Sequence, residues 1–200
     1  MHIRGFQPRD TDELYRVCLR TGDAGEDATA LYTDPRLLGE VYVGPYLALE
    51  PQAALVIELD GVASAYALCA PDTAAFEAAC AATWWPPLRE RYPLGTFPAG
   101  SPDDELVRTI HDPPRTSPEL LREYPAHLHI DLVPEVQGRG LGGELIRTLL
   151  TQQARVGVPG IHLGVATTNL RAIGFYEHLG FSTLCVDGDT TVMGLRLTTA

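Results

Sequence analysis

A glycine-rich stretch between a strand-like and a helix-like segment is the first candidate for chemistry in this chain. The stretch reads Q-G-R-G-L-G-G at residues 137–143, after the alternating segment 126–133 and before the amphipathic segment 141–155. Glycines at such a junction let backbone N–H groups and the positive end of the helix dipole converge on an anion. The stretch therefore predicts an anion-binding loop at the start of a helix.

Two common phosphate-binding motifs do not account for this loop. Its glycines match the G-x-G-x-x-G dinucleotide fingerprint, but that fingerprint requires an acidic residue at the end of the next strand for the ribose. The next predicted strand, 161–167, contains no Asp or Glu. A Walker loop requires Gly-Lys-Ser/Thr, which does not follow the glycines. The loop therefore belongs to another class of anion site.

A second motif about thirty residues downstream decides which class. It reads N-x-x-A-x-x-x-Y at 169–176 and continues as H-L-G-F at 178–181, whereas the loop itself reads Q-x-x-G-x-G at 137–142. Together these motifs closely resemble the GNAT superfamily of acyl-CoA-dependent N-acyltransferases. The segment Y-P-A-H-L-H-I-D-L before the loop, with a proline-rich segment upstream, also resembles the acetyltransferase-like domains related to the C-terminal part of O-GlcNAc hydrolases.

The resemblance implies that the loop binds the pyrophosphate of coenzyme A. Glycine is required there because a Cβ would keep the backbone away from the phosphates. The pantetheine arm is expected to pair with the main chain at Leu132 and Val133, in a wedge between this strand and 161–167. Asn169 is expected to contact the coenzyme arm, although capping of its helix alone would also explain it. The backbone amides expected to hold the pyrophosphate are those of Gln137, Gly138, Arg139, Gly140, Leu141 and Gly142.

Tyr176 corresponds to the tyrosine that, in the family it resembles, protonates the departing coenzyme A thiolate. A phenol has a pKa of about 10, so at neutral pH it is protonated and can donate to sulfur. The alternative is a tyrosine that simply packs in an amphipathic helix.

His127, His129 and Asp131 alternate along the strand before the loop, so they are expected on one of its faces. Such a polar trio is costly on a central strand unless it is hydrogen-bonded or functional. Asp131 is the candidate for orienting the acceptor or taking its proton, because it lies nearest the thioester end of the wedge. The alternatives are a network that only shapes the sheet, a His-x-His-x-Asp metal site, and a water relay to Glu135 or to a histidine. The transfer needs no metal, and none is expected.

These residues predict an acetyltransferase that moves the acetyl group of acetyl-CoA directly to an amine, in a ternary complex. The alternative from another class is a non-catalytic acetyl-CoA-binding module with a regulatory or scaffolding role. The acceptor is expected to be a small amine or a basic peptide, because acidic residues recur at 23–27 and 103–105. Glycoside hydrolysis would require paired carboxylates, which no spacing in the chain indicates.

The surrounding segments predict an α/β fold with a mixed sheet. Two hairpins, 54–70 and 181–197, contain Asp-Gly turns, and strand–helix–strand–helix patterns lie between them. Segment 161–167 is apolar on both faces, which is typical of a buried parallel strand. A helix is predicted over 73–83. The GNAT fold that the chain resembles has a twisted, mostly antiparallel sheet with one splayed parallel pair and helices on both faces.

One domain is expected over residues 1–200, with a proline-rich excursion at about 86–125 that contains nine of the sixteen prolines. The net charge of −11 argues against nucleic acid or an anionic membrane as partner, since both require concentrated positive charge. The four cysteines fit no zinc or redox spacing, and the start lacks the apolar core of a signal peptide. A cytoplasmic protein is therefore expected, and homodimers are common in the fold it resembles.

Overall fold

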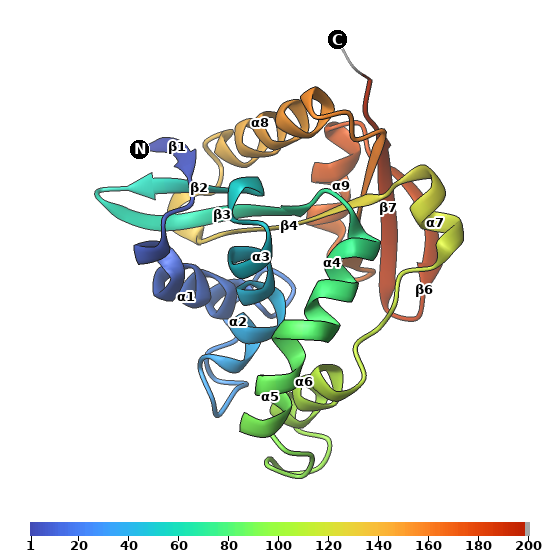
Figure 1. Ribbon diagram of the computed structural model, residues 1–200. Coiled ribbons are helices and arrows are strands. Elements are labelled where there is room, and N and C mark those ends of the chain that lie inside the picture. The colour runs from blue at the N-terminus through green and yellow to red at the C-terminus, as the bar shows by residue number, and fades with distance from the viewer. Residues whose placement is uncertain (199–200) are drawn as a thin grey trace.

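The computed structural model describes residues 1–198, and a twisted seven-stranded sheet runs through its middle (Figure 1). The strands are β1 (His2–Gly5), β2 (Ala54–Leu59), β3 (Val62–Ala70), β4 (Ala126–Leu132), β5 (Gly160–Ala166), β6 (Ser182–Asp187) and β7 (Thr190–Arg196). Their spatial order is β1-β2-β3-β4-β5-β7-β6. Within the described residues, β4 and β5 form the one parallel pair and the other neighbours are antiparallel. The predicted mixed sheet is confirmed.

Both predicted hairpins form at their Asp-Gly sequences. Between β2 and β3, Asp60 and Gly61 have φ angles of 52° and 85°. Two consecutive positive φ angles are the signature of a type I′ turn, whose twist matches that of the flanking strands. The β6–β7 turn includes Gly188, with φ of 55°. The first hairpin belongs to the half of the sheet formed by β1 to β4, and the second belongs to the half formed by β5 to β7.

The junction between the halves is short. In the parallel pair, only Ala126 with Ile161 and His127 with His162 are in register, and the strands then diverge. By contrast, β5 pairs with β7 along seven positions. The predicted splayed parallel pair is confirmed, and the apolar character of β5 also reflects its central place beside β7.

Helices cover both faces of the sheet (Figure 1). The longest helix, α8, lies across one face and packs on β2 and β3, whereas α1 and α3 lie on the other face. The predicted apolar stripe of α8 is buried at Leu145, Ile146 and Leu149. The helices are α1 (Thr11–Thr21), α2 (Leu37–Tyr42), α3 (Gly44–Leu49), α4 (Thr73–Ala79), α5 (Trp85–Arg91), α6 (Pro102–His111), α7 (Pro118–Glu123), α8 (Leu141–Arg155) and α9 (Leu170–His178).

The predicted helix end at Thr83 is wrong. A π-helical turn at Cys80–Trp84 joins α4 to α5, so helical structure continues to Arg91. Pro86 and Pro87 are tolerated because they lie in the first turn of α5, where no intrahelical partner for an N–H is lost.

The proline-rich excursion is held to the N-terminal helices by specific hydrogen bonds. The hydroxyl of Tyr92 donates to Asp34 Oδ2 at 2.8 Å, and the buried Asp103 accepts from the Thr33 and Asp34 N–H groups. Just before the excursion, the indole N–H of Trp84 donates to the Glu40 carbonyl. These hydrogen bonds hold the excursion against the N-terminal part of the chain.

In the part of the chain that the structure describes, no helix has the length and apolar character needed to cross a membrane.

Candidate active site

The divergence of β4 from β5 leaves a backbone edge facing a gap. Residues of an antiparallel strand bond alternately toward one neighbour and toward the other side. Because the N–H of Val133 donates to the carbonyl of Ser64 on β3, the residues at odd-numbered positions of β4 bond toward β3. The main-chain groups that point toward the gap are those of Leu128, Ile130 and Leu132.

This alternation separates the two residues that were predicted to pair with a pantetheine arm. Leu132 directs its carbonyl into the gap, where Nε2 of Gln137 donates to it at 2.7 Å. Val133 has both main-chain groups engaged, since its N–H bonds to Ser64 and its carbonyl accepts from the Val136 N–H. At Leu132 an arm would have to displace the Gln137 side chain, whereas at Val133 it would have to break two backbone hydrogen bonds, so pairing favours Leu132 and Ile130 over Val133.

A cavity of about 690 Å³ occupies the gap. This volume suits an extended small-molecule ligand. The cavity brings the glycine loop, β4 and the first turns of α9 to one site. Its walls include the predicted residues Asp131, Leu132, Gln137, Gly138, Gly140, Gly142, Asn169 and Tyr176.

The loop reaches α8 through two glycines in the left-handed region. Gly138 and Gly140 have φ of 71° and 76°, and an added Cβ on either would point into open space. Gly140 is the N-cap of α8, which has no side-chain capping hydrogen bond, and the first N–H groups of any helix lack intrahelical partners. The start of α8 thus presents unpaired donors and the positive end of the helix dipole to the cavity.

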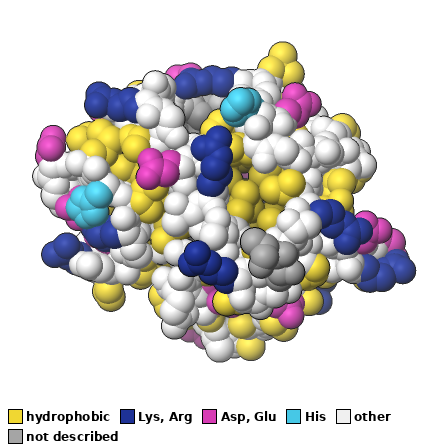
Figure 2. Space-filling view, turned by 90° about the horizontal axis from the view of Figure 1, so that it is seen from above, with side chains coloured by type: hydrophobic (Ala, Val, Ile, Leu, Met, Phe, Trp, Pro, Cys, Tyr) yellow, Lys and Arg dark blue, Asp and Glu magenta, His cyan; other side chains and the backbone are white. Residues whose placement is uncertain are grey.

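Arginines add positive charge around the loop. Arg171 lines the cavity and donates from Nη2 to Gln137 Oε1 at 2.8 Å. Arg139 is exposed at the loop tip, and Leu141 is the first residue of α8. All fifteen basic residues of the chain are arginines, and Figure 2 shows them dispersed among apolar and acidic side chains on the face seen from above. An anion in the cavity would therefore be held by local donors, in a chain with a net charge of −11.

Asn169 makes two hydrogen bonds at the start of α9. Its Oδ1 accepts from the Ala172 N–H at 3.0 Å, which is the predicted capping bond. Its Nδ2 donates to the carbonyl of Ala24 at 2.8 Å, in the loop after α1. Both Ala24 and Asn169 line the cavity, so this contact joins two of its walls.

Tyr176 is buried on α9 and lines the cavity beside β4. Its ring packs against Phe175 and Phe181, with centroid separations of 5.4 and 5.7 Å. Burial raises the pKa of its phenol well above the ordinary value, and the negative charge of Asp131 raises it further. The phenol is therefore neutral at physiological pH and available as a proton donor.

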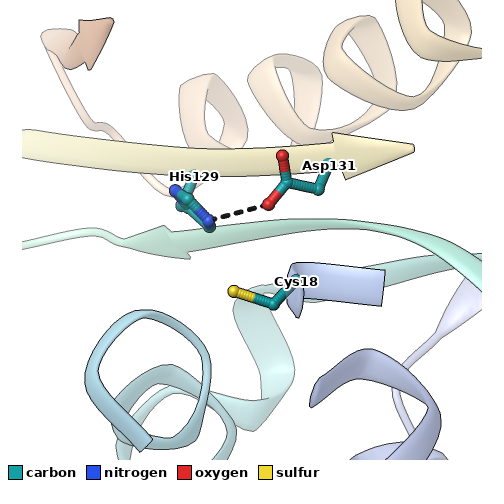
Figure 3. A group of neighbouring side chains, drawn as sticks. All are labelled: Cys18, His129 and Asp131. Carbon is teal, nitrogen blue, oxygen red and sulfur yellow. Dashed lines mark ion pairs between the residues drawn. The ribbon is translucent and has the colours of Figure 1, made fainter. Parts of the chain in front are cut away.

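Asp131 belongs to a compact polar cluster under β4. The Tyr66 hydroxyl donates to Asp131 Oδ2 and lies 2.9 Å from His129 Nε2, which is itself 3.1 Å from Asp131 Oδ2. Cys18 reaches the same place from α1 (Figure 3). Burial, followed by the charges of Asp131 and Cys18, holds the pKa of Tyr66 well above its ordinary value. The Tyr66 phenol is thus a permanent donor to the carboxylate.

His127 shares the strand face with His129 and Asp131, as predicted, but it serves another cavity. Its Nδ1 lies 2.8 Å from the Thr73 hydroxyl, and its ring lies 5.4 Å from the ring of Tyr46. A predicted His-x-His-x-Asp metal site is therefore not assembled, because His127 does not join the described group of potential ligands.

The second cavity, of about 310 Å³, lies on the excursion side of the gap. It shares Tyr42, Leu128, His129 and Gly164 with the first, so the two meet where β4 and β5 separate. Its aromatic walls come from helices α2 to α5 and consist of Tyr42, Tyr46, Phe76 and Trp85.

Comparison with known families identifies this architecture. Residues 24–181 match the family model described as acetyltransferase (GNAT) family, a span that contains the loop, both diverging strands and α9. The chain belongs to the GNAT acetyltransferase family. The resemblance read from the two sequence motifs is thereby confirmed.

Individual relatives agree with this GNAT membership. Protein O-GlcNAcase of Rattus norvegicus is 26% identical over 204 residues, covering 98% of this chain and 22% of that protein. The chain thus spans about a fifth of this curated relative, and the predicted link to O-GlcNAc hydrolases is confirmed. The crystal structure of SsHAT is 39% identical, with a TM-score of 0.92 and 98% of each chain covered. The fold is shared by yncA, a putative acetyltransferase from Salmonella typhimurium solved with acetyl-CoA, at 18% identity and a TM-score of 0.58, with 98% and 94% of the chains covered.

Sequence reasoning did not find three residues that line or adjoin the larger cavity. Tyr66 and Cys18 lie far from the motifs in the chain, and each also fits its own apolar pattern in β3 or α1. The register of β3 against β4 is what places Tyr66 opposite Asp131. Arg171 stands inside the recognised helix motif, at one of its variable positions, so a basic residue two positions after Asn169 was the available signal.

Proposed function

We propose that this chain transfers the acetyl group of acetyl-CoA to an amine in a ternary complex. The observation that carries the proposal is one continuous path. The larger cavity extends from the glycine loop along the free edge of β4, includes Tyr176 in its walls, and meets the second cavity at Leu128, His129 and Gly164. Membership of the GNAT family and the acetyl-CoA bound to yncA support the coenzyme.

In this proposal the pyrophosphate lies on the amides of 138–142 at the start of α8, because the N–H of Gln137 already donates to the Pro134 carbonyl. The pantetheine arm follows β4 and displaces the Gln137 amide from the Leu132 carbonyl. Arg171, released together with Gln137, is then free to pair with a phosphate. Asn169 keeps its cap and donates to the arm from Nδ2.

The amine enters from the second cavity, whose walls offer aromatic rings and Glu77. Its nitrogen attacks the thioester carbon and loses a proton to Asp131, with His129 beside the carboxylate. The main-chain N–H group of Ile130, beyond the last paired position of β4 and β5, stabilises the oxyanion. As the C–S bond breaks, the Tyr176 phenol gives its proton to the thiolate, and the amide product and coenzyme A leave. The proposal retains the single catalytic domain predicted over residues 1–200, in which β1, β6 and β7 complete the sheet around the matched residues 24–181.

The test is a thiol-release assay with acetyl-CoA and a panel of small amines and basic peptides, with calorimetric titration of acetyl-CoA run in parallel. We expect turnover with at least one amine. Because this chain contains no lysine, acetylation of its own lysine side chains cannot mimic transfer. Binding of acetyl-CoA without thiol release on any acceptor would instead support the rival, a non-catalytic binding module.

A further inference from the structure

The cluster beneath β4 contains a set of metal-ligand atoms that acetyl transfer does not require. Cys18, His129 and Asp131 each offer one ligand atom, and these atoms all lie within 4.8 Å of one another. Figure 3 shows the two side chains of β4 lying next to each other, with the Cys18 sulfur reaching toward them from α1. Within the described residues this is the group of His, Cys, Asp and Glu side chains that converges closely enough to hold an ion.

The spacing is close to that of a tetrahedral site. Zinc binds Cys sulfur at about 2.3 Å and His nitrogen or carboxylate oxygen at about 2.0–2.2 Å, which places the ligand atoms roughly 3.3–3.6 Å apart. His129 Nε2 and Asp131 Oδ2 are already 3.1 Å apart. The sulfur has only to approach by about 1 Å, a movement within reach of a side-chain rotation.

Tyr66 would help to orient such a site. Its hydroxyl donates to Oδ2 of Asp131, the oxygen that lies 3.1 Å from His129 Nε2, and the second lone pair of this oxygen can bind an ion. A hydrogen bond to a ligating carboxylate fixes the ligand and is a usual part of a metal site.

The donor set also selects the kind of ion and gives it access. One thiolate with one imidazole favours borderline or soft cations such as Zn²⁺ over Mg²⁺ or Ca²⁺, which prefer oxygen. All three side chains line the 690 Å³ cavity, so an ion can enter through it, and the fourth position faces the cavity space. Three protein ligands with an open fourth position are characteristic of reactive rather than purely structural zinc sites.

We propose that Cys18, His129 and Asp131 form a binding site for a thiophilic divalent cation, with Zn²⁺ as its reference ion. Occupation of this site takes the lone pairs of Asp131 and His129. The cation therefore inhibits acetyl transfer, a consequence that rests on the proposed function, whereas binding itself does not.

The binding test uses the whole chain without acetyl-CoA. Zn²⁺ is titrated by calorimetry, and Co²⁺ is added separately to look for the absorption band of a thiolate–cobalt bond. Cys18→Ser and His129→Gln should each weaken Zn²⁺ binding about 100-fold and Cys18→Ser should abolish the cobalt–thiolate band. Cys69→Ser is the matched control, because it replaces another buried cysteine outside the cluster and should bind as the unmodified chain does.

The unfolding of each variant is measured without metal. If Cys18→Ser folds poorly, His129→Gln still tests the site, because His129 is partly exposed and its replacement should disturb the fold less. Failure of the unmodified chain to bind Zn²⁺, or Zn²⁺ affinity in both cluster variants equal to that of the unmodified chain, would overturn the proposal. A cobalt spectrum without a thiolate band would do the same. If Zn²⁺ binds as expected but no amine is ever acetylated, the metal site stands and the proposed transfer fails.

Discussion

His127 and His162 face each other at the last position where β4 and β5 are paired, with ring centroids 5.7 Å apart. The Nδ1 atom of His127 forms a hydrogen bond with the Thr73 hydroxyl. The Nδ1 atom of His162 forms one with the Tyr124 carbonyl. Burial lowers the pKa of His127 to about 3, and the neighbouring histidines His162 and His129 contribute to the shift. Two neutral rings can therefore adjoin without repulsion, and the gap that forms the site opens from this fixed point.

Replacing Tyr176 by Phe should lower kcat about 100-fold or more and leave the Kd for acetyl-CoA within about twofold, because loss of a general acid typically costs that much. The Phe ring keeps the packing against Phe175 and Phe181. Steady-state kinetics with a competent amine and a binding titration measure the two effects. A Phe variant with full kcat across the pH range would remove Tyr176 from the mechanism.

Gly140→Ala should weaken acetyl-CoA binding at least about tenfold, because the new Cβ would enter the space assigned to the phosphates. The left-handed backbone conformation should separately cost the folded state about 1–2 kcal/mol. Gly157→Ala is the matched control: Gly157 also has a positive φ, of 85°, with open space around it, but follows the far end of α8. Both variants should lose similar unfolding free energy. Equal effects on acetyl-CoA binding would place the pyrophosphate elsewhere.

Ala81→Trp should raise the KM for the amine about tenfold or more, with the KM for acetyl-CoA unchanged, because Ala81 lines the second cavity only. Ala78→Trp introduces the same bulk on exposed surface of α4, away from both cavities, and should behave as the unmodified enzyme. Kinetics with each substrate varied in turn separate the effects. A rise in the KM for acetyl-CoA alone would reverse the assignment of the two cavities.

The ion pair of Arg4 with Asp10 should make stability depend on pH in the acid range. Burial tends to raise the pKa of Asp10, but hydrogen bonds from Arg4 and the Gln7 N–H outweigh it, so the net shift is downward. A lowered folded-state pKa gives stability that is present above the unfolded value of about 4 and is lost as pH falls through the folded value.

Asp10→Asn should lower the free energy of unfolding by about 2 kcal/mol at pH 7, and it should reduce the loss of stability as the pH falls. Urea unfolding from pH 7 to pH 2 measures both effects. Asp12→Asn breaks an exposed pair with Arg36 and should cost less than about 0.5 kcal/mol. Comparable losses for the two variants would show that the Asp10 pair has no special role.

Local sequence signals predicted much of this molecule. Asp60-Gly61 and Asn169 specify a hairpin turn and a helix cap through their own backbone chemistry, and both features are present. The glycines of the loop likewise require left-handed backbone that few other residues adopt. Such signals depend on neighbours in the chain, so a single sequence contains them.

The remainder depends on partners distant in sequence. Tyr66 reads as one apolar residue of a buried strand, and only the register of β3 on β4 makes it a donor to Asp131. The N–H of Val133 likewise donates to the Ser64 carbonyl, a bond between distant residues that strand periodicity cannot reveal. The helix beyond Thr83 escaped prediction because proline in a first turn and proline in a helix interior look alike in sequence.

The two-residue contact between β4 and β5 also bears on how the chain folds. Strands β1 to β4 come from residues 2–132 and β5 to β7 from 160–196, and each group is internally joined by long antiparallel ladders. The two groups can therefore form as separate cooperative units, with α8 as the tether between them. A ligand that contacts both groups of strands would hold them together. Native-state hydrogen exchange should therefore slow along β4 and β5 when acetyl-CoA is added.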